Sequence, residues 1–125
     1  MTSSLQGTTS PATRAEPVFD RAGTLARLGG DEELFAELVR YFREDCVQLR
    51  RRLETALADG DAKAAEVAAH AIKGLCLNFG AVDAVAAASS VEACAREGNL
   101  ADVRRLLPFL TAKVGALDAA LPRTS

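Results

Sequence analysis

The sequence predicts an all-α protein, an antiparallel up-and-down four-helix bundle with a short extra helix at its N-terminal end. Hydrophobic residues make up 49% of the 125 residues but aromatic residues only 5%, so the core has to be built from Leu, Val and Ala. This composition favours closely packed helices. Apolar residues also recur at spacings of three and four over long stretches, and glycines and capping residues separate these stretches with short breaks.

One domain accounts for the chain, and we expect it over residues 17–122. Residues 1–16 are rich in Ser, Thr, Gly and Pro without hydrophobic periodicity, so they are expected to be a disordered leader. The apolar residues of 17–28 fit a short amphipathic helix, which stops at Gly29-Gly30. We expect this helix to lie across one end of the bundle.

The first long helix begins after Asp31, which can cap it, and runs to about Ala58. Its expected buried stripe consists of Phe35, Leu38, Phe42, Cys46, Leu49, Leu53 and Ala56. A tight break at 59–61 follows, and Asp61 can cap the second long helix, which ends at Gly80. Because the break is so short, these two helices should form an antiparallel hairpin.

The third long helix is expected over residues 82–97 and is closed by Gly98. Its buried stripe should be Val85, Ala88, Val91 and Ala95. Asn99 can cap the last helix, in which the same spacing selects Val103, Leu107, Leu110, Val114, Leu117 and Leu121. Four long helices with short turns predict the up-and-down arrangement.

The only histidine of the chain lies on the second long helix. At about 100° per residue, one face of that helix holds His70, Lys73, Gly74 and Leu77, and the other holds Ala68, Ile72, Leu75 and Phe79. The imidazole should therefore stand on a helix whose back is anchored in the core. Gly74 costs this helix about 1 kcal/mol relative to Ala, and close approach of a partner is the natural gain. A nucleophilic nitrogen, a nearby cation and an open approach suit reversible transfer of an anionic group between proteins.

The string His70-x-x-Lys73-Gly74, followed by Asn78-x-Gly80, resembles the signature of histidine-containing phosphotransfer (HPt) domains, the relay modules of multistep two-component signalling. The likeness covers about residues 18–121 and extends to Phe19-Asp20, Leu28-Gly29-Gly30-Asp31, Val91-Glu92 and Ala95-Arg96-Glu97-Gly98. The sequence departs from the family where small residues usually follow the glycine, since it has Leu75, Cys76 and Leu77 there. Leu75 should be buried, whereas Leu77, on the face of His70, should influence which receiver domain the protein prefers.

The resemblance implies that Nε2 of His70 takes a phosphoryl group from an aspartate of one receiver domain and passes it to an aspartate of another. The expected partners are receiver domains of response regulators and of a hybrid sensor histidine kinase. Those receivers would supply the carboxylates and Mg²⁺, so no cofactor or metal is expected on this chain. His70 is the residue expected to be phosphorylated, and the residues expected to support it or to dock the partner are Lys73, Gly74, Asn78, Val67 and Leu77.

Other function classes find little support. A net charge of −2 offers no basic face for nucleic acid. The chain has no glycine-rich phosphate loop, no acidic cluster for Mg²⁺ and no His/Cys/Ser arrangement for hydrolysis, so a phosphocarrier without an ATP site is expected rather than an enzyme. Three scattered cysteines, no membrane-length apolar run and no signal peptide predict a cytoplasmic protein. Four long helices in one chain predict a monomer.

Several alternatives stay open. The chain could be a receiver- or kinase-binding adaptor that carries no phosphate, or the dimerisation region of a histidine kinase, which needs two chains to complete four helices. Asn78 could be a structural group at the helix end rather than part of the site. Glu66, one turn before His70, is a candidate to hold the other ring nitrogen. The run Arg50-Arg51-Arg52 could attract an acidic partner or form a solvated face.

Overall fold

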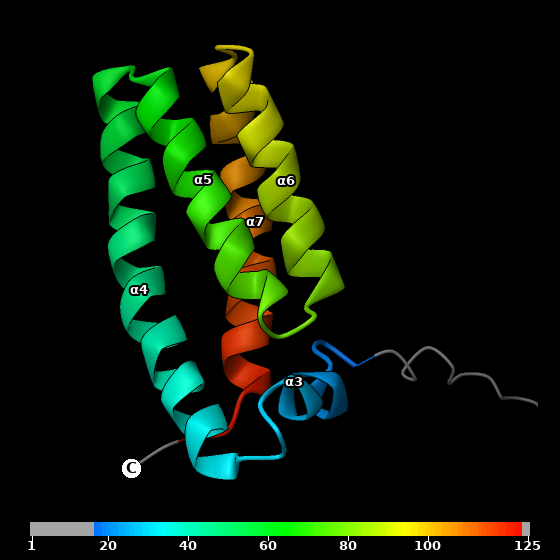
Figure 1. Ribbon diagram of the computed structural model, residues 1–125. Helices are drawn as coiled ribbons and strands as arrows, with labels where there is room; N and C mark the ends of the chain where they lie inside the picture. Colours follow the sequence, from blue (N-terminus) through cyan, green and yellow to red (C-terminus); the bar gives the residue numbers. More distant parts are fainter. Residues whose placement is uncertain (1–16, 124–125) are drawn as a thin grey trace, which may run out of the picture.

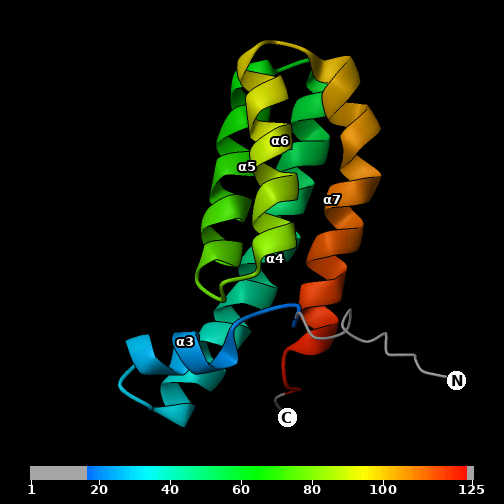
Figure 2. The same ribbon diagram turned by 90° about the vertical axis from the view of Figure 1, so that its right-hand side faces the viewer.

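The computed structural model describes residues 17–123, and within that range the chain is helical without strands. The expected leader, residues 1–16, lies outside the described residues. The helices are α3 (Arg21–Arg27), α4 (Glu32–Asp59), α5 (Ala62–Leu77), α6 (Val82–Arg96) and α7 (Leu100–Ala120). Figures 1 and 2 show α4 to α7 running alternately up and down beside one another, with α3 across the lower end. The all-α bundle is therefore confirmed. None of the helices described is long and apolar enough to cross a bilayer.

The starts of the long helices follow the capping residues that the sequence indicates. The side chain of Asp31 accepts a hydrogen bond from the backbone N–H of Leu34, and Asp61 accepts one from Ala64. Such bonds satisfy backbone donors that have no partner inside the helix. At the end of α4, Gly60 adopts a left-handed φ of 71°, which a residue with a side chain rarely takes. The turn to α5 is short as a result, and the two helices are antiparallel.

The first helix is shorter than expected. A helix over residues 17–28 is wrong, because α3 covers only Arg21–Arg27 and is capped by Asp20. The backbone N–H of Asp20 donates to the carbonyl of Phe79 at 2.8 Å, so the chain before α3 is tied to the end of α5 and cannot continue the helix. Phe19 precedes α3 and packs its ring 6.2 Å from that of Phe79.

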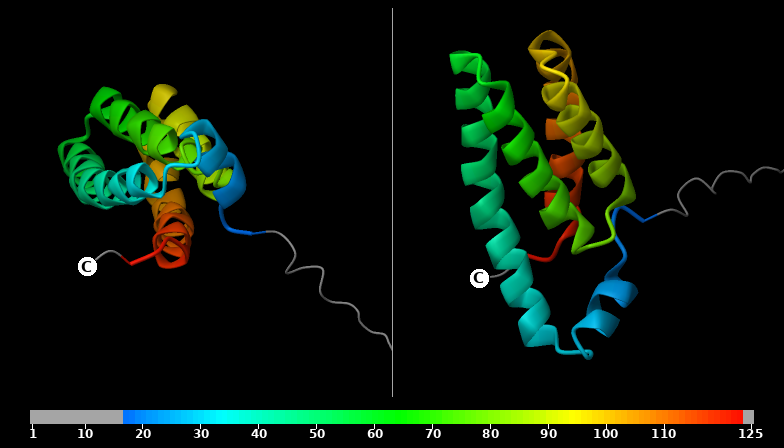
Figure 3. Two further views of the ribbon diagram at one scale, coloured as in Figure 1. Left: turned by 60° about the horizontal axis from the view of Figure 1, so that its bottom comes forward. Right: turned by 45° about the horizontal axis from the view of Figure 1, so that its top comes forward.

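The short helix α3 covers the end of the bundle at the turn from α5 to α6, as Figure 3 shows from below. The guanidinium of Arg27 donates to the carbonyl of Asn78 at 2.7 Å, and the buried hydroxyl of Thr24 reaches the same carbonyl at 3.2 Å. Both bonds satisfy one carbonyl that the end of α5 leaves free. Gly80 also approaches Asp20 so closely that a Cβ there would lie 2.9 Å from the Asp20 Cβ.

Most of the expected core residues are buried. On α4 the expected stripe is correct for Phe35, Phe42, Leu53 and Ala56, whereas Leu38, Cys46 and Leu49 are half-buried and Val39 and Leu57 join the core instead. Leu75, expected to be buried, is half-buried. Small residues occupy most buried positions of α5 and α6, the two helices with the most extensive mutual contact: Ala65, Ala68, Ala69, Ala84, Ala87 and Ala88. These alanines allow the two backbones to approach closely, which brings side chains of α6 next to the histidine on α5.

Candidate functional site

The imidazole of His70 is presented to solvent from the middle of α5. Its neighbours Ala68, Ala69 and Ile72 are buried, so the helix is anchored on both sides of the histidine position. The His70 side chain itself is 67% exposed. The ring is therefore neither enclosed in the core nor covered by another part of residues 17–123.

An open strip runs along α5 on either side of the ring. Val67 is 58% exposed and Leu77 is 54% exposed, although both are apolar. Gly74 is also exposed, and a side chain at its position would meet no atom within 4 Å. We call Val67, His70, Gly74 and Leu77 the histidine strip. His70, Gly74 and Leu77 lie on the exposed face that the sequence predicts, whereas Lys73, predicted on the same face, is half-buried.

The inner nitrogen of the His70 ring is held by Glu92 of α6. The distance from Nδ1 of His70 to Oε2 of Glu92 is 2.9 Å. The suggestion that Glu66 would hold this nitrogen is wrong, because the Glu66 carboxylate instead accepts from Nε of Arg96 at 3.0 Å. Side chains on a helix lean toward its N-terminus, which directs Glu66 away from the turn that carries His70.

Glu92 is a buried carboxylate surrounded by three nitrogen groups. Its residue exposure is only 6%, and besides His70 it contacts Nζ of Lys73 at 2.8 Å and a terminal guanidinium nitrogen of Arg96 at 3.0 Å. The hydrogen bond from Lys73 is the main reason that the pKa of Glu92 lies below its ordinary value, with the His70 bond adding to the effect against the cost of burial. The carboxylate is therefore ionised at neutral pH.

The ionised carboxylate determines the tautomer of His70. A carboxylate only accepts hydrogen bonds, so Nδ1 of His70 must carry the proton and donate it to Glu92. In the neutral ring the lone pair then lies on Nε2. The exposed side of the imidazole is thus its nucleophilic side.

Glu92 belongs to the family likeness in the sequence, but its contact with the ring was not predicted. One local signal was available. Glu92 falls within the buried stripe of α6, between Val91 and Ala95. A carboxylate in such a stripe needs a charged or hydrogen-bonding partner, because burying it alone is costly. The identity of that partner depends on how α5 and α6 are aligned.

Lys73 and Asn78 lie in different surroundings. The ammonium group of Lys73 is turned toward Glu92, so this lysine shares a carboxylate with His70. Asn78 caps the C-terminal end of α5, about 12 Å further along the helix axis than His70 at 1.5 Å per residue. Its backbone carbonyl joins α5 to α3 through Arg27. A role for the Asn78 side chain in the site stays a prediction.

The three consecutive arginines of α4 point in different directions. Arg50 lines a groove between α4 and α7, whereas Arg52 lines a smaller hollow beside Ala71 and Leu75 of α5. Arg51 lines neither of these two hollows. The run is therefore not a single basic patch, since Arg50 and Arg52 line different hollows.

Comparison with known proteins finds one similar family and one similar solved structure. A family model described as Hpt domain matches residues 37–120, which include both His70 and Glu92. The crystal structure of histidine-containing phosphotransfer protein B (HptB) from Pseudomonas aeruginosa PAO1 is similar, with a TM-score of 0.76 and 27% sequence identity. The match covers 84% of this chain and 91% of that chain. No curated protein matches the chain.

Proposed function

The chain belongs to the Hpt domain family, and from this premise we propose that His70 is the residue through which it relays phosphoryl groups. Histidine phosphotransfer in a phosphorelay is the function of the protein, and Hpt proteins are phosphocarriers rather than kinases. One observation supports the assignment of His70 as the phosphorylated residue. The chain contains one histidine, and that residue is exposed with Nδ1 held by Glu92.

The transfer step follows from the state of the ring. The lone pair of Nε2 attacks the phosphorus of an aspartyl phosphate in line with the bond that breaks, and the aspartate carboxylate leaves. An N–P bond forms as the O–P bond breaks, and no proton has to be removed because Nε2 carries none. The ring gains positive charge in this step, which the Glu92 carboxylate stabilises through Nδ1–H. Transfer to a second receiver is the reverse reaction.

The receiver domains supply what this chain lacks in our proposal. The receiver's acidic residues and its Mg²⁺ would neutralise the phosphoryl oxygens, so this chain needs neither a metal nor an ATP site. Lys73 can assist from its position beside Glu92 by turning toward the added phosphoryl charge. Catalysis on this side then consists of positioning and electrostatics.

Receiver domains would dock on the histidine strip. Val67 and Leu77 offer exposed apolar contacts on either side of His70, and Gly74 leaves room for close approach of a partner backbone. We propose that the same strip serves donor and acceptor, the receiver of a hybrid sensor kinase and that of a response regulator. A single chain completes the bundle, so the protein should act as a monomer.

Phosphoryl transfer from a panel of labelled receiver domains tests the assignment. Wild type and the control variant Arg51→Gln should become labelled by at least one receiver, whereas His70→Gln should not. Labelling of His70→Gln equal to that of wild type would contradict the assignment. If wild type binds a receiver tightly but never becomes labelled, the chain is an adaptor of the same fold.

A further inference from the structure

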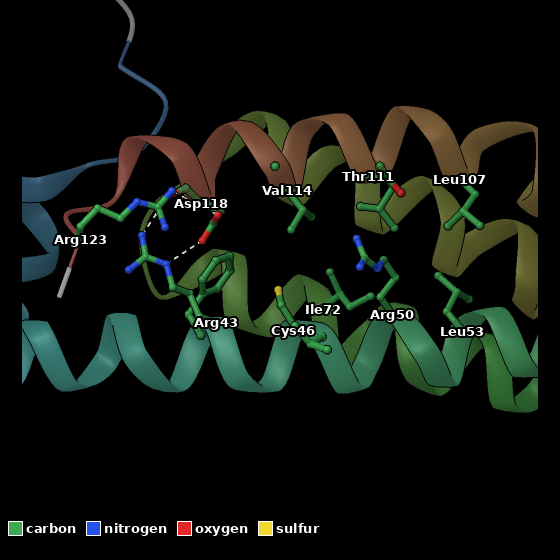
Figure 4. Close-up of a pocket in the computed structure, with 14 residues that line it drawn as sticks. Arg43, Cys46, Arg50, Leu53, Ile72, Leu107, Thr111, Val114, Asp118 and Arg123 are labelled. Atoms are coloured by element: carbon green, nitrogen blue, oxygen red, sulfur yellow. Dashed lines mark hydrogen bonds and ion pairs between the residues drawn. The ribbon is translucent and has the colours of Figure 1, made fainter. Parts of the chain in front are cut away.

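A groove separates α4 from α7 on the side of the bundle away from α6. Its volume is about 430 Å³, which lies within the range of about 300–1,000 Å³ for small-molecule sites. Figure 4 shows the two helices facing each other across it. Its floor is apolar and includes Phe42, Cys46, Ile72, Leu110 and Val114. We call this space the α4–α7 groove.

One end of the α4–α7 groove is closed by ion pairs and hydrogen bonds of Arg43, Asp118 and Arg123, which we call the Arg43 latch. Nε of Arg43 donates to Oδ1 of Asp118 at 2.7 Å, and the same guanidinium donates to the carbonyl of Pro122 at 2.9 Å. Arg123 approaches the other carboxylate oxygen of Asp118 at 3.8 Å. These groups hold the C-terminal end of α7 against α4 and leave little capacity for a further ligand.

Arg50 differs from the arginines of this latch. Its side chain rises from α4 toward Thr111 of α7, beside the apolar floor (Figure 4). It makes no ion pair or side-chain hydrogen bond with any other residue in the range 17–123. The groove thus carries three arginines, Arg43, Arg50 and Arg123, against one carboxylate, Asp118, and its excess charge is positive.

The thiol in the groove offers no competing covalent chemistry. Burial raises the pKa of Cys46 to about 12, so its sulfur stays protonated at neutral pH. A protonated, half-buried thiol behaves as a small apolar group rather than as a nucleophile. The α4–α7 groove therefore combines an apolar floor with one available cation.

We propose that the α4–α7 groove binds a small amphiphilic anion, with a carboxylate or sulfonate on Arg50 and an aliphatic or aromatic body on the floor. A guanidinium binds such oxyanions through two parallel hydrogen bonds. Ile72 faces the groove from α5, whereas His70, two residues earlier, faces the opposite side of that helix. A ligand in the groove leaves the histidine strip uncovered, so this site is independent of phosphotransfer.

Two residues that occur once in the chain provide reporters for the test. Ile72 is the only isoleucine and His70 is the only histidine, so an isoleucine-methyl and a histidine-ring NMR spectrum each contain one signal. Titration with decanoate below micelle-forming concentrations should shift the Ile72 signal saturably and leave the His70 signal in place. Decanol and decyltrimethylammonium should bind at least about tenfold more weakly, because decanol offers the guanidinium only a neutral hydroxyl and the ammonium carries the same charge as the guanidinium.

Three variants locate the binding site within the groove. Arg50→Gln should weaken decanoate binding about tenfold, since it removes the charge and leaves a shorter, neutral polar side chain. Arg51→Gln makes the same charge change one residue away, outside the groove, and should bind as wild type. Gly115→Leu places a side chain among the lining residues, where a Cβ meets no atom within 4 Å, and should abolish binding while the helix persists.

Several results would overturn the proposal. These are no saturable Ile72 shift, equal binding of decanoate and decanol, binding that survives both Arg50→Gln and Gly115→Leu, or decanoate displacing the His70 signal instead. Sedimentation of the ligand-free protein is the further control. A dimer that Gly115→Leu disrupts would show that a second copy of the chain, rather than a small anion, occupies the groove.

Discussion

Glu92 of α6 accepts a hydrogen bond from Nδ1 of His70 of α5 at 2.9 Å, and this contact joins the two helices at the proposed site of phosphorylation. It assigns the proton to the inner nitrogen and the lone pair to the outer one. The same carboxylate also binds Lys73 and Arg96, so the orientation of the imidazole depends on one buried acidic group.

Removing the charge of Glu92 should slow phosphoryl transfer without abolishing it. Glu92→Gln can still accept a bond from Nδ1–H but no longer stabilises the positive ring, which we expect to cost about tenfold in transfer rate. The rate from a phosphorylated receiver measures this effect. ¹⁵N spectra of the single histidine should also show less of the tautomer with the proton on Nδ1. Glu66→Gln is the matched control, since the Glu66 carboxylate binds Arg96 and not the ring. Equal transfer rates for wild type and Glu92→Gln would contradict a positioning role of Glu92.

The lowered pKa of Glu92 makes part of the stability dependent on pH. A carboxylate whose pKa falls on folding stabilises the native state above its unfolded value, about 4.5, and this contribution is lost as pH falls through the lower folded value. The difference in free energy of unfolding between wild type and Glu92→Gln should be constant above pH 4.5 and shrink below it. Urea unfolding between pH 7 and pH 3 measures this difference. A gap that is unchanged across the range would show that the Glu92 pKa is not lowered in the folded state.

Substitutions of Gly74 should separate stability from docking. A side chain at this position meets no atom within 4 Å, so Gly74→Ala should stabilise the helix by about 0.5–1 kcal/mol. Gly74→Gln should also fold but should weaken receiver binding, because its side chain extends from the histidine strip toward the partner. Thermal unfolding and receiver titration measure the two effects. Gly115→Ala gives the same helix gain on α7 and should leave receiver binding unchanged; a similar loss of binding in that variant would refute the steric explanation.

The Arg43 latch should contribute to stability but not to transfer. Arg43→Gln removes the ion pair with Asp118 and the bonds to the carbonyls of Pro122 and Leu121. We expect a loss of about 1–3 kcal/mol in the free energy of unfolding, because these groups are partly buried and charged. Denaturant unfolding measures the loss, with Arg51→Gln as the exposed control. If Arg43→Gln retains full stability, α7 does not depend on this latch.

Local features of the sequence determined most of the helices and the outward direction of the histidine. The caps at Asp31 and Asp61 and the turn glycine Gly60 act within a few residues of their own position. The alternation of buried and exposed residues around His70 likewise follows from helix geometry alone. Such features need no knowledge of the rest of the fold, so a sequence suffices to locate them.

The tertiary structure decided the features that depend on contacts between distant segments. The shorter α3 results from the hydrogen bond between Asp20 and Phe79. Glu92, rather than the expected Glu66, contacts the His70 ring because of how α5 and α6 are aligned. The α4–α7 groove exists because α4 and α7 contact each other far less than the other neighbouring long helices do. All three features depend on side-chain packing, because packing fixes how the helices shift and rotate against one another. The helical period of a single segment contains no information on the position of its neighbours.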